Sequence, residues 1–403
     1  MDLSKLAVAA QGVLYAFILT QQGSVVGGAW FPHGLGSKLG GNLEMRTCRT
    51  DKWRGAMSHR KMFALGLVAT GATILLIIGP VLSPRAFAES SYTLIPVEYS
   101  MQLKTPDGHV VFEYVTRKPE NIGLTSPSAA YFHPVNTPSG ETVTNVAPDD
   151  HPHHRGIFLG FLESEFHTPS GVSQIRPDQP LRVFDIQRGD FWSWGFYAPR
   201  DNRVIRNRDI KLTSADTKRA QLEIHNEWLI ENTKLLDETD EVTVTERDGV
   251  YVIDLAYQLA PIVDYMLKHQ AFGGFAVQGQ KAGEHYYSTA SGKVTLPSPY
   301  YSVPDLDWPA EPWYDYTIHL TRDGKVVGFA VLDHPLNAPT RWHNTVWMIN
   351  PCITSFGDMT IHRDEPLVLR YRVVVHDGPP PTELLQKLSE EWRGMQSNPF
   401  VSH

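Results

Sequence analysis

Three segments of the chain place the pair Asp-Gly between two stretches of alternating apolar and polar residues. They are MQLKTPDGHVVFEYV (101–115), VTVTERDGVYVIDLAYQL (242–259) and YTIHLTRDGKVVGFAVLD (316–333). Asp-Gly tolerates positive φ at both central positions of a tight turn, and a period of two is typical of strands with one buried face. Each segment therefore predicts a β-hairpin, and a chain with three such hairpins must build antiparallel sheets.

Most of the remaining sequence between about residues 92 and 378 continues the strand pattern. The stretches LRVFDIQRGDFWSWGFYA, QLEIHNEWLI and LVLRYRVVVHDG are all rich in β-branched and aromatic residues. Only TELLQKLSEEW, which follows Pro379-Pro380-Pro381, has helical spacing, and it predicts one helix over 382–393. No repeat of fixed length is visible, which argues against a propeller. We therefore expect an all-β fold, a single large antiparallel β-sandwich with one C-terminal helix; a mutarotase-like supersandwich is one form that it could take.

The N-terminal part of the chain looks like an export signal. Arg60 and Lys61 precede an apolar run from Met62 to Leu82, and Ala86-Phe87-Ala88 follows as a small-x-small cleavage site. We interpret 57–88 as a signal peptide cleaved before Glu89, with a retained N-terminal anchor as the alternative, and 1–56 as a mis-called extension. Residues 89–403 would then form one domain in the periplasm or outside the cell.

Charge restricts the partners of this domain. Nine of the 36 Lys and Arg residues and three of the 44 Asp and Glu residues precede Glu89, which leaves 27 basic and 41 acidic residues and a net charge of −14. Such a surface repels nucleic acid and anionic membranes. We therefore expect a small-molecule or saccharide ligand, no nucleic acid, and no membrane contact beyond the possible anchor.

The stretch DHPHHR (150–155) concentrates titratable groups directly before the apolar run GIFLGFL. If the stretch is extended, His151 and His153 point to one side, His154 to the other, and Arg155 returns to the first side. The histidines could then flank a ligand or donate protons, Asp150 could orient an imidazole, and Arg155 could hold a carboxylate or sugar hydroxyls. The alternative is a structural turn whose polar groups satisfy each other.

A second Asp-His-Pro occurs at the end of the third hairpin. Asp333 and His334 end the strand there, and Asn337, Trp342 and His343 follow within DHPLNAPTRWHN. We expect both segments to form one pocket, in which Trp342 and Asn337 bind the substrate and Asp333 orients an imidazole. The other tryptophans, such as Trp192 and Trp194, are either a saccharide platform or part of the core.

Together, DHPHHRGIFLGF, DGKVVGFAVLDHPLNAPTRWH, Asn350-Pro351 and LRYRVVVHDG resemble the PmoA-like family, a bacterial domain of unknown function, over residues 100–395. After Gly160 the chain departs from the usual pattern of that family. The resemblance implies export and work on carbohydrates. The methane oxygenase label attached to the family does not suit this chain, because no apolar run of even 15 residues follows residue 88.

Three functions remain open from the sequence. The first is an enzyme that uses His153, His154, His334 and His343 for acid/base chemistry on a sugar derivative, with Arg155 as clamp. The second is a saccharide-binding module without catalysis. The third is a metal-dependent variant of either, with Zn²⁺ or copper held by His151 and His153. We expect no cofactor and no metal, because the sequence has no i,i+4 histidine pair and Arg155 places a cation beside the cluster.

Overall fold

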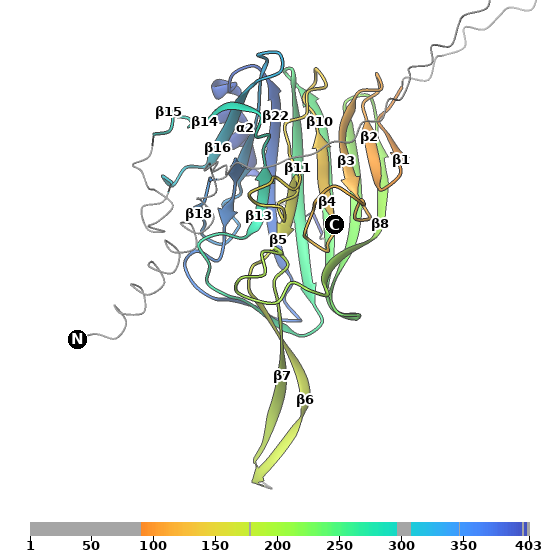
Figure 1. Ribbon diagram of the computed structural model, residues 1–403, viewed down its shortest axis with the longest axis vertical. Coiled ribbons are helices and arrows are strands. Elements are labelled where there is room, and N and C mark those ends of the chain that lie inside the picture. Colours follow the sequence, from red (N-terminus) through yellow and green to blue (C-terminus); the bar gives the residue numbers. More distant parts are fainter. Residues whose placement is uncertain (1–89, 177–178, 296–307, 346, 397–398, 401–403) are drawn as a thin grey trace, which may run out of the picture. The chain divides into compact units, whose positions relative to one another are not determined.

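A computed structural model describes residues 90–176, 179–295, 308–345, 347–396 and 399–400 of the protein (Figure 1). The expected leader, the cleavage site and the extension 1–56 lie outside the described residues. Nearly all regular structure is strand, and every strand pair is antiparallel. The expected all-β architecture with one C-terminal helix is therefore confirmed.

Two large sheets contain most of the strands. The seven-stranded sheet has the order β1-β2-β3-β4-β5-β13-β19. Its strands are β1 (Thr93–Pro96), β2 (Ser100–Lys104), β3 (Val110–Val115), β4 (Tyr131–Val135), β5 (Ile157–Gly160), β13 (Gly274–Gln278) and β19 (Met348–Ile349). The nine-stranded sheet has the order β15-β14-β16-β17-β22-β11-β10-β9-β8. Its strands are β8 (Arg203–Ala215), β9 (Arg219–Ile230), β10 (Thr233–Arg247), β11 (Val250–Pro261), β14 (Gly283–Thr289), β15 (Gly292–Lys293), β16 (Trp313–Leu320), β17 (Val326–Asp333) and β22 (Leu367–Asp377).

Two smaller sheets complete the fold. One has the order β21-β12-β6-β7 and the other pairs β18 with β20. The bounds are β6 (Ser164–Arg176), β7 (Gln179–Gly189), β12 (Asp264–Leu267), β21 (Met359–Ile361), β18 (Arg341–Trp342) and β20 (Pro351–Cys352). In Figure 1, β6 and β7 form a long hairpin that extends away from the other strands.

All three expected Asp-Gly hairpins are present, as β2–β3, β10–β11 and β16–β17. In the β10–β11 turn both Asp248 and Gly249 have positive φ, at 52° and 79°. In the other two turns it is the glycine, Gly108 or Gly324, that has positive φ. The sequence pattern therefore predicted the hairpins correctly, although the turns differ in geometry.

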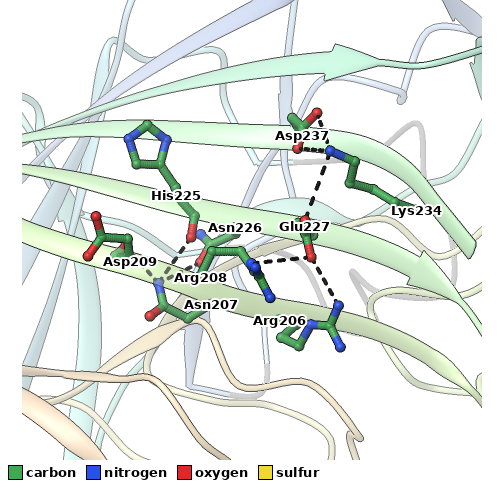
Figure 2. Close-up of polar contacts among 9 residues, drawn as sticks. All are labelled: Arg206, Asn207, Arg208, Asp209, His225, Asn226, Glu227, Lys234 and Asp237. Atoms are coloured by element: carbon green, nitrogen blue, oxygen red, sulfur yellow. Dashed lines mark hydrogen bonds and ion pairs between the residues drawn. The ribbon is translucent and has the colours of Figure 1, made fainter. Parts of the chain in front are cut away.

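The two large sheets pack face to face. Side chains of both sheets form one continuous core, which includes Leu103, Phe112 and Val135 from the first sheet and Leu222, Val242 and Ile253 from the second. Along β9, successive side chains point to opposite faces of the nine-stranded sheet. Asn226 and Trp228 point inward and are buried. Between them, Glu227 points outward and forms ion pairs with three cations of β8 and β10: Arg206, Arg208 and Lys234 (Figure 2).

Helix α2 (Thr382–Gly394) lies where the sequence predicted a helix. Its apolar side contacts the outer face of the nine-stranded sheet through Leu385, Leu388 and Trp392. The guanidinium of Arg372 lies 4.6 Å from the ring centre of Trp392 and donates to the main-chain oxygen of Leu388 at 3.1 Å. The helix thus covers strands that would otherwise expose apolar side chains. Over the described ranges, none of the helices combines the length and apolar character that a membrane crossing needs.

We expect Leu388→Ala to lower the free energy of unfolding by about 2–5 kcal/mol, because it removes a fully buried side chain between α2 and the sheet. Lys387→Ala, at the neighbouring exposed position, should change it by about 0.5 kcal/mol or less. Urea unfolding followed by tryptophan fluorescence measures both. Equal effects of the two substitutions would contradict the packing described for α2.

Candidate functional site

The six residues DHPHHR form a turn and are not extended. The main-chain N–H of His154 donates to the oxygen of His151, and that of Ala147 donates to the oxygen of His154. The expected alternation of the imidazoles is therefore wrong, because the turn gathers all three on one side. Their ring centres are 5.8 Å (His151–His153), 4.9 Å (His151–His154) and 4.5 Å (His153–His154) apart. We call these three residues the histidine cluster.

Gly156 allows the turn to enter β5. It has a φ of 48°, and a Cβ placed on it would lie 1.9 Å from the main-chain oxygen of Phe132 in β4. No larger residue can adopt this backbone so close to a neighbouring strand. The position of the histidine cluster at the start of β5 therefore depends on this glycine.

Burial lowers the pKa of all three imidazoles, which favours their neutral forms. Burial lowers the pKa of His154 to about 3, and its Nδ1 hydrogen-bonds Oε1 of Gln278 at 2.7 Å. Burial, together with the neighbouring imidazoles and guanidinium groups, holds the pKa of His153 far below its usual range. The ring of His153 forms no hydrogen bond with any described residue, although His153 is only 4% exposed.

Arg155 is 0% exposed, so it anchors loops in the interior. Its guanidinium donates to the main-chain oxygens of Phe191 (3.1 Å), Trp192 (3.4 Å) and His153 (3.3 Å) and lies over the ring of Phe158. Burial lowers its pKa to about 10. The expected role as a substrate clamp does not fit a side chain with no exposed surface. Its role is to join the histidine turn to the segment after β7.

That segment carries Trp194, which is half-buried, and Phe196 and Tyr197, which are exposed; Phe272, from the stretch before β13, is 9% exposed and packs against Trp194. Trp194 lies 5.5 Å from Phe196, 5.9 Å from Tyr197 and 5.4 Å from Phe272, measured between ring centres. Phe196 and Tyr197 are 46% and 38% exposed, in a chain that buries most of its large apolar side chains. We call Trp194, Phe196, Tyr197 and Phe272 the aromatic platform.

Two imidazoles border the aromatic platform. The ring of His153 is nearly parallel to Trp194, at 6.2 Å and 23°. The ring of His343 stacks on Phe272 at 5.1 Å, and burial lowers its pKa to about 4. His343 thus borders the platform at Phe272, and His153 borders it at Trp194. The sequence had placed Trp194 among several possible platform residues, and no local pattern distinguished it from the buried tryptophans.

The other residues of the second Asp-His-Pro segment have different neighbours. His334 packs against Trp392 of α2, its Nε2 donates to the main-chain oxygen of Met395, and its Nδ1 accepts from the N–H of Leu336. Asp333 accepts from the side chains of Asn337 and Thr340. The polar groups of this segment hydrogen-bond to one another and to nearby main chain. They therefore do not form the single pocket that we expected from the two Asp-His-Pro segments.

Trp342 is 2% exposed, its Nε1 donates to the main-chain oxygen of Glu311, and its ring contacts Tyr314. The expected stacking residue is therefore part of the core. Asn337 is also buried and exchanges hydrogen bonds with the main chain of Arg370. Neither side chain is open to a substrate, because Trp342 packs against Tyr314 of β16 and Asn337 bonds the main chain of β22.

Asp150 and His151 form the outer edge of the histidine cluster. The carboxylate of Asp150 accepts from Nζ of Lys281 at 2.9 Å and lies 3.5 Å from Nδ1 of His151. Nζ of Lys281 also lies 4.2 Å from the ring centre of Trp347. Across the described part of the chain, no three His, Cys, Asp or Glu side chains are grouped as metal ligands would be.

A buried carboxyl pair in the core was not anticipated from the sequence. Glu238 and Asp240 point inward from β10 and are 3% and 1% exposed. Asn226 donates to both, at 2.6 and 3.2 Å, and Nε1 of Trp228 donates to Glu238 at 2.7 Å. Burial raises the pKa of Glu238 to about 7, and burial with the charge of Glu238 raises that of Asp240. The stretch DETDE (237–241) of β10 is acidic at four of its five positions and looks like exposed strand, which is why the pair was missed.

The comparisons with known proteins give a family but no activity. A model of a family of unknown function, DUF6807, matches residues 104–390. The expected resemblance to the PmoA-like family is therefore wrong, and nothing indicates a methane oxygenase. No curated protein matches the chain.

Similar solved structures include two α-galactosidases of Geobacillus stearothermophilus and a galactose mutarotase related enzyme of Lactobacillus acidophilus. The GH36 α-galactosidase AgaA, in complex with stachyose, is 9% identical, with coverage of 71% of this chain and 40% of that chain and a TM-score of 0.28. The GH36 α-galactosidase AgaB is 9% identical, with coverage of 72% and 39% and a TM-score of 0.29. The mutarotase-related enzyme is 6% identical, with coverage of 71% and 97% and a TM-score of 0.29. The chain thus spans about two fifths of the length of either α-galactosidase.

The buried carboxyl pair predicts that stability falls as pH rises. Because the pKa of Glu238 is raised in the folded state, the folded protein keeps a proton that the unfolded chain releases. The resulting stabilisation is complete below the unfolded pKa of about 4.3 and is lost as pH rises through about 7, a change on the order of 3 kcal/mol. Denaturant unfolding between pH 4.5 and 8 measures it. Glu238→Gln should flatten this dependence, whereas Glu246→Gln, at an exposed position of β10, should leave it unchanged. A wild-type slope in Glu238→Gln would contradict the assignment.

Proposed function

This chain belongs to DUF6807, a family of unknown function, and from its site we propose that it is an exported saccharide-binding protein. The binding surface is the aromatic platform, with His153 and His343 at its border. The observation that carries the proposal is the exposure of Phe196 and Tyr197 in continuous ring contact with Trp194 and Phe272. Sugar rings stack their C–H faces on such surfaces, while adjacent polar groups bond the hydroxyls.

The imidazoles suit hydrogen bonding to a neutral ligand. A neutral imidazole offers one donor and one acceptor, which matches the hydroxyl groups of a sugar. The ring of His153 has no hydrogen-bond partner among the described residues and lies nearly parallel to Trp194. A sugar placed on Trp194 would therefore find a hydrogen-bonding ring at its edge.

A second candidate function is an acid/base enzyme acting on a sugar derivative. It is suggested by the ring of His153, which forms no hydrogen bond with a described residue, but burial holds the pKa of that imidazole far below its usual range and so makes it a weak base. A proton donor with a matched pKa is also needed. Asp190 has a pKa raised by burial to about 6, but its two oxygens accept the N–H groups of Ser193 and Gly195. The binding function therefore stands first.

We expect Trp194→Ala to weaken saccharide binding at least about tenfold, which corresponds to the loss of one stacking ring. Tyr286→Ala, a half-buried aromatic residue on β14, is the matched control and should bind as the wild type does. A glycan array identifies ligands, and titration calorimetry measures the affinities. Full retention of binding in Trp194→Ala would exclude the platform as the site. Release of a product over hours, lost in His153→Gln, would favour the enzyme.

The proposed location is the periplasm or the exterior of the cell, because residues 57–88 have the pattern of a signal peptide. We expect the native protein to begin at Glu89, so that its intact mass corresponds to residues 89–403. Mass spectrometry of the protein from its own organism measures this. A native N-terminus before Met57 would contradict both the leader and the mis-called extension, and one at Met57 or Met62 would indicate a retained anchor.

A further inference from the structure

Trp347 is a second partly exposed aromatic residue near the histidine cluster, and it does not belong to the aromatic platform. Its main chain has a φ of 62°. Positive φ is costly for a bulky residue, and it persists where surrounding contacts offset the cost. Here the main-chain oxygen of Trp347 accepts the N–H of Gly279 at 2.7 Å and Nε2 of Gln278 at 3.4 Å. These two hydrogen bonds fix the backbone that carries the indole.

One buried side chain joins Trp347 to the histidine cluster. Gln278, at the end of β13, is 0% exposed, and its Oε1 lies 2.7 Å from Nδ1 of His154. The other end of the same amide, Nε2, donates to the main-chain oxygen of Trp347. Binding sites depend on side chains that buried hydrogen bonds hold in position. Trp347 therefore keeps a fixed position relative to His154.

A partly exposed ion pair lies between the histidine cluster and Trp347. The carboxylate of Asp150 accepts from Nζ of Lys281 at 2.9 Å and lies 3.5 Å from Nδ1 of His151. The same Nζ is 4.2 Å from the ring centre of Trp347. The side chains of His151, Asp150 and Lys281 are 29%, 35% and 37% exposed. These side chains and the indole therefore form a continuous row that a ligand can reach.

This row and the aromatic platform lie toward opposite ends of β13. Phe272 of the platform comes two residues before the strand, whereas Trp347 is bonded to Gln278 and Gly279 at its other end. The five residues of the strand span about 13 Å. The histidine cluster borders the platform on one side and the ion pair on the other. A ligand that contacts both the platform and Trp347 must therefore be longer than one sugar ring.

We propose that Asp150, Lys281 and Trp347 form a second sugar subsite, so that the protein binds an oligosaccharide. This inference rests on the proposed function, and it adds the class of the ligand. One sugar unit lies on Trp194, the linkage passes the histidine cluster, and a further unit packs against the exposed part of Trp347. The carboxylate of Asp150 accepts hydrogen bonds from hydroxyl groups of that unit, and the ammonium of Lys281 donates to its oxygens.

The chemistry of this second subsite suits a neutral ligand rich in hydroxyl groups. The charges of Asp150 and Lys281 balance each other, so the ion pair favours neither an anion nor a cation. His285, which is exposed on β14, has its ring centre 5.9 Å from that of Trp347 and offers a further hydrogen-bonding group. A partly exposed ion pair contributes little to stability, so its substitution should leave the fold intact.

Saccharides of increasing length test the proposal. The probes are cello-, xylo-, manno- and galacto-oligosaccharides of one to five units, and titration calorimetry measures each affinity. In at least one series the dissociation constant should fall at least about tenfold between the shortest member that binds and the longest. Each added unit that reaches the second subsite gains contacts there, which is the reason for the increase. Affinity independent of length in every series that binds would overturn the second subsite.

Substitutions locate the second subsite. Trp347→Asn keeps a residue that adopts positive φ readily, and Lys281→Met keeps a long side chain without the charge. Each should weaken binding of the longest member about fivefold to tenfold and leave the shortest member that binds unaffected. Tyr286→Ala is the control and should change neither, because Tyr286 points to the opposite face of β14 from His285. Melting temperatures equal to that of the wild type show that the variants are folded.

The outcomes separate this inference from the proposed function. Wild-type affinity for the longest member in both Trp347→Asn and Lys281→Met, with binding lost in Trp194→Ala, would overturn the second subsite and leave the saccharide function standing. Equal weakening of short and long members in Trp347→Asn would also overturn it, because Trp347 would then contact the first sugar unit. Failure to bind any of these saccharides or any glycan on an array would overturn both proposals.

Discussion

The buried guanidinium of Arg155 is the interaction on which the proposed site depends. Moving a cation out of water costs several kcal/mol, and only well-placed acceptors offset that cost. Here the acceptors are main-chain oxygens of Phe191, Trp192 and His153, and the ring of Phe158 covers the cation. One side chain therefore links the histidine turn before β5 to the segment after β7. Two stretches about 40 residues apart in the chain share a single anchor.

The backbone beyond that anchor is shaped by Asp190. Ser193 and Gly195 both have positive φ, at 74° and 77°, and on either side of Trp194 they turn the chain sharply. The carboxylate of Asp190 accepts the N–H groups of both, at 2.6 and 2.5 Å. A residue other than glycine, such as Ser193, keeps a positive φ only where surrounding contacts offset its energetic cost. Together, Arg155 and Asp190 account for the fact that Trp192 is in the core whereas Trp194, two residues later, reaches the surface.

The sequence predicted the elements of this fold better than their arrangement. The Asp-Gly turns and the helix over 382–393 are local signals, because φ preferences and helical spacing act over a few residues. The histidine turn was misread as extended, since the hydrogen bond from His154 to His151 competes with the strand geometry that Pro152 favours. Trp342 and His334 looked like site residues because their burial is decided by Glu311, Trp392 and Met395, which are distant in sequence. Contacts between residues so far apart in the sequence leave no local pattern in it.

The histidine cluster and the cations around it belong to one electrostatic arrangement. Arg155 and Arg200 act on His153, and burial acts in the same direction, so the imidazoles stay neutral although three of them lie together. A proton on His153 would add to the positive charges of Arg155 and Arg200 that already act on it. His153 can therefore serve as a neutral hydrogen-bonding group at the border of the aromatic platform. A neutral imidazole has one donor and one acceptor, which suits the hydroxyls of the proposed saccharide ligand, and this role gives the crowding of DHPHHR before a buried strand a physical reason.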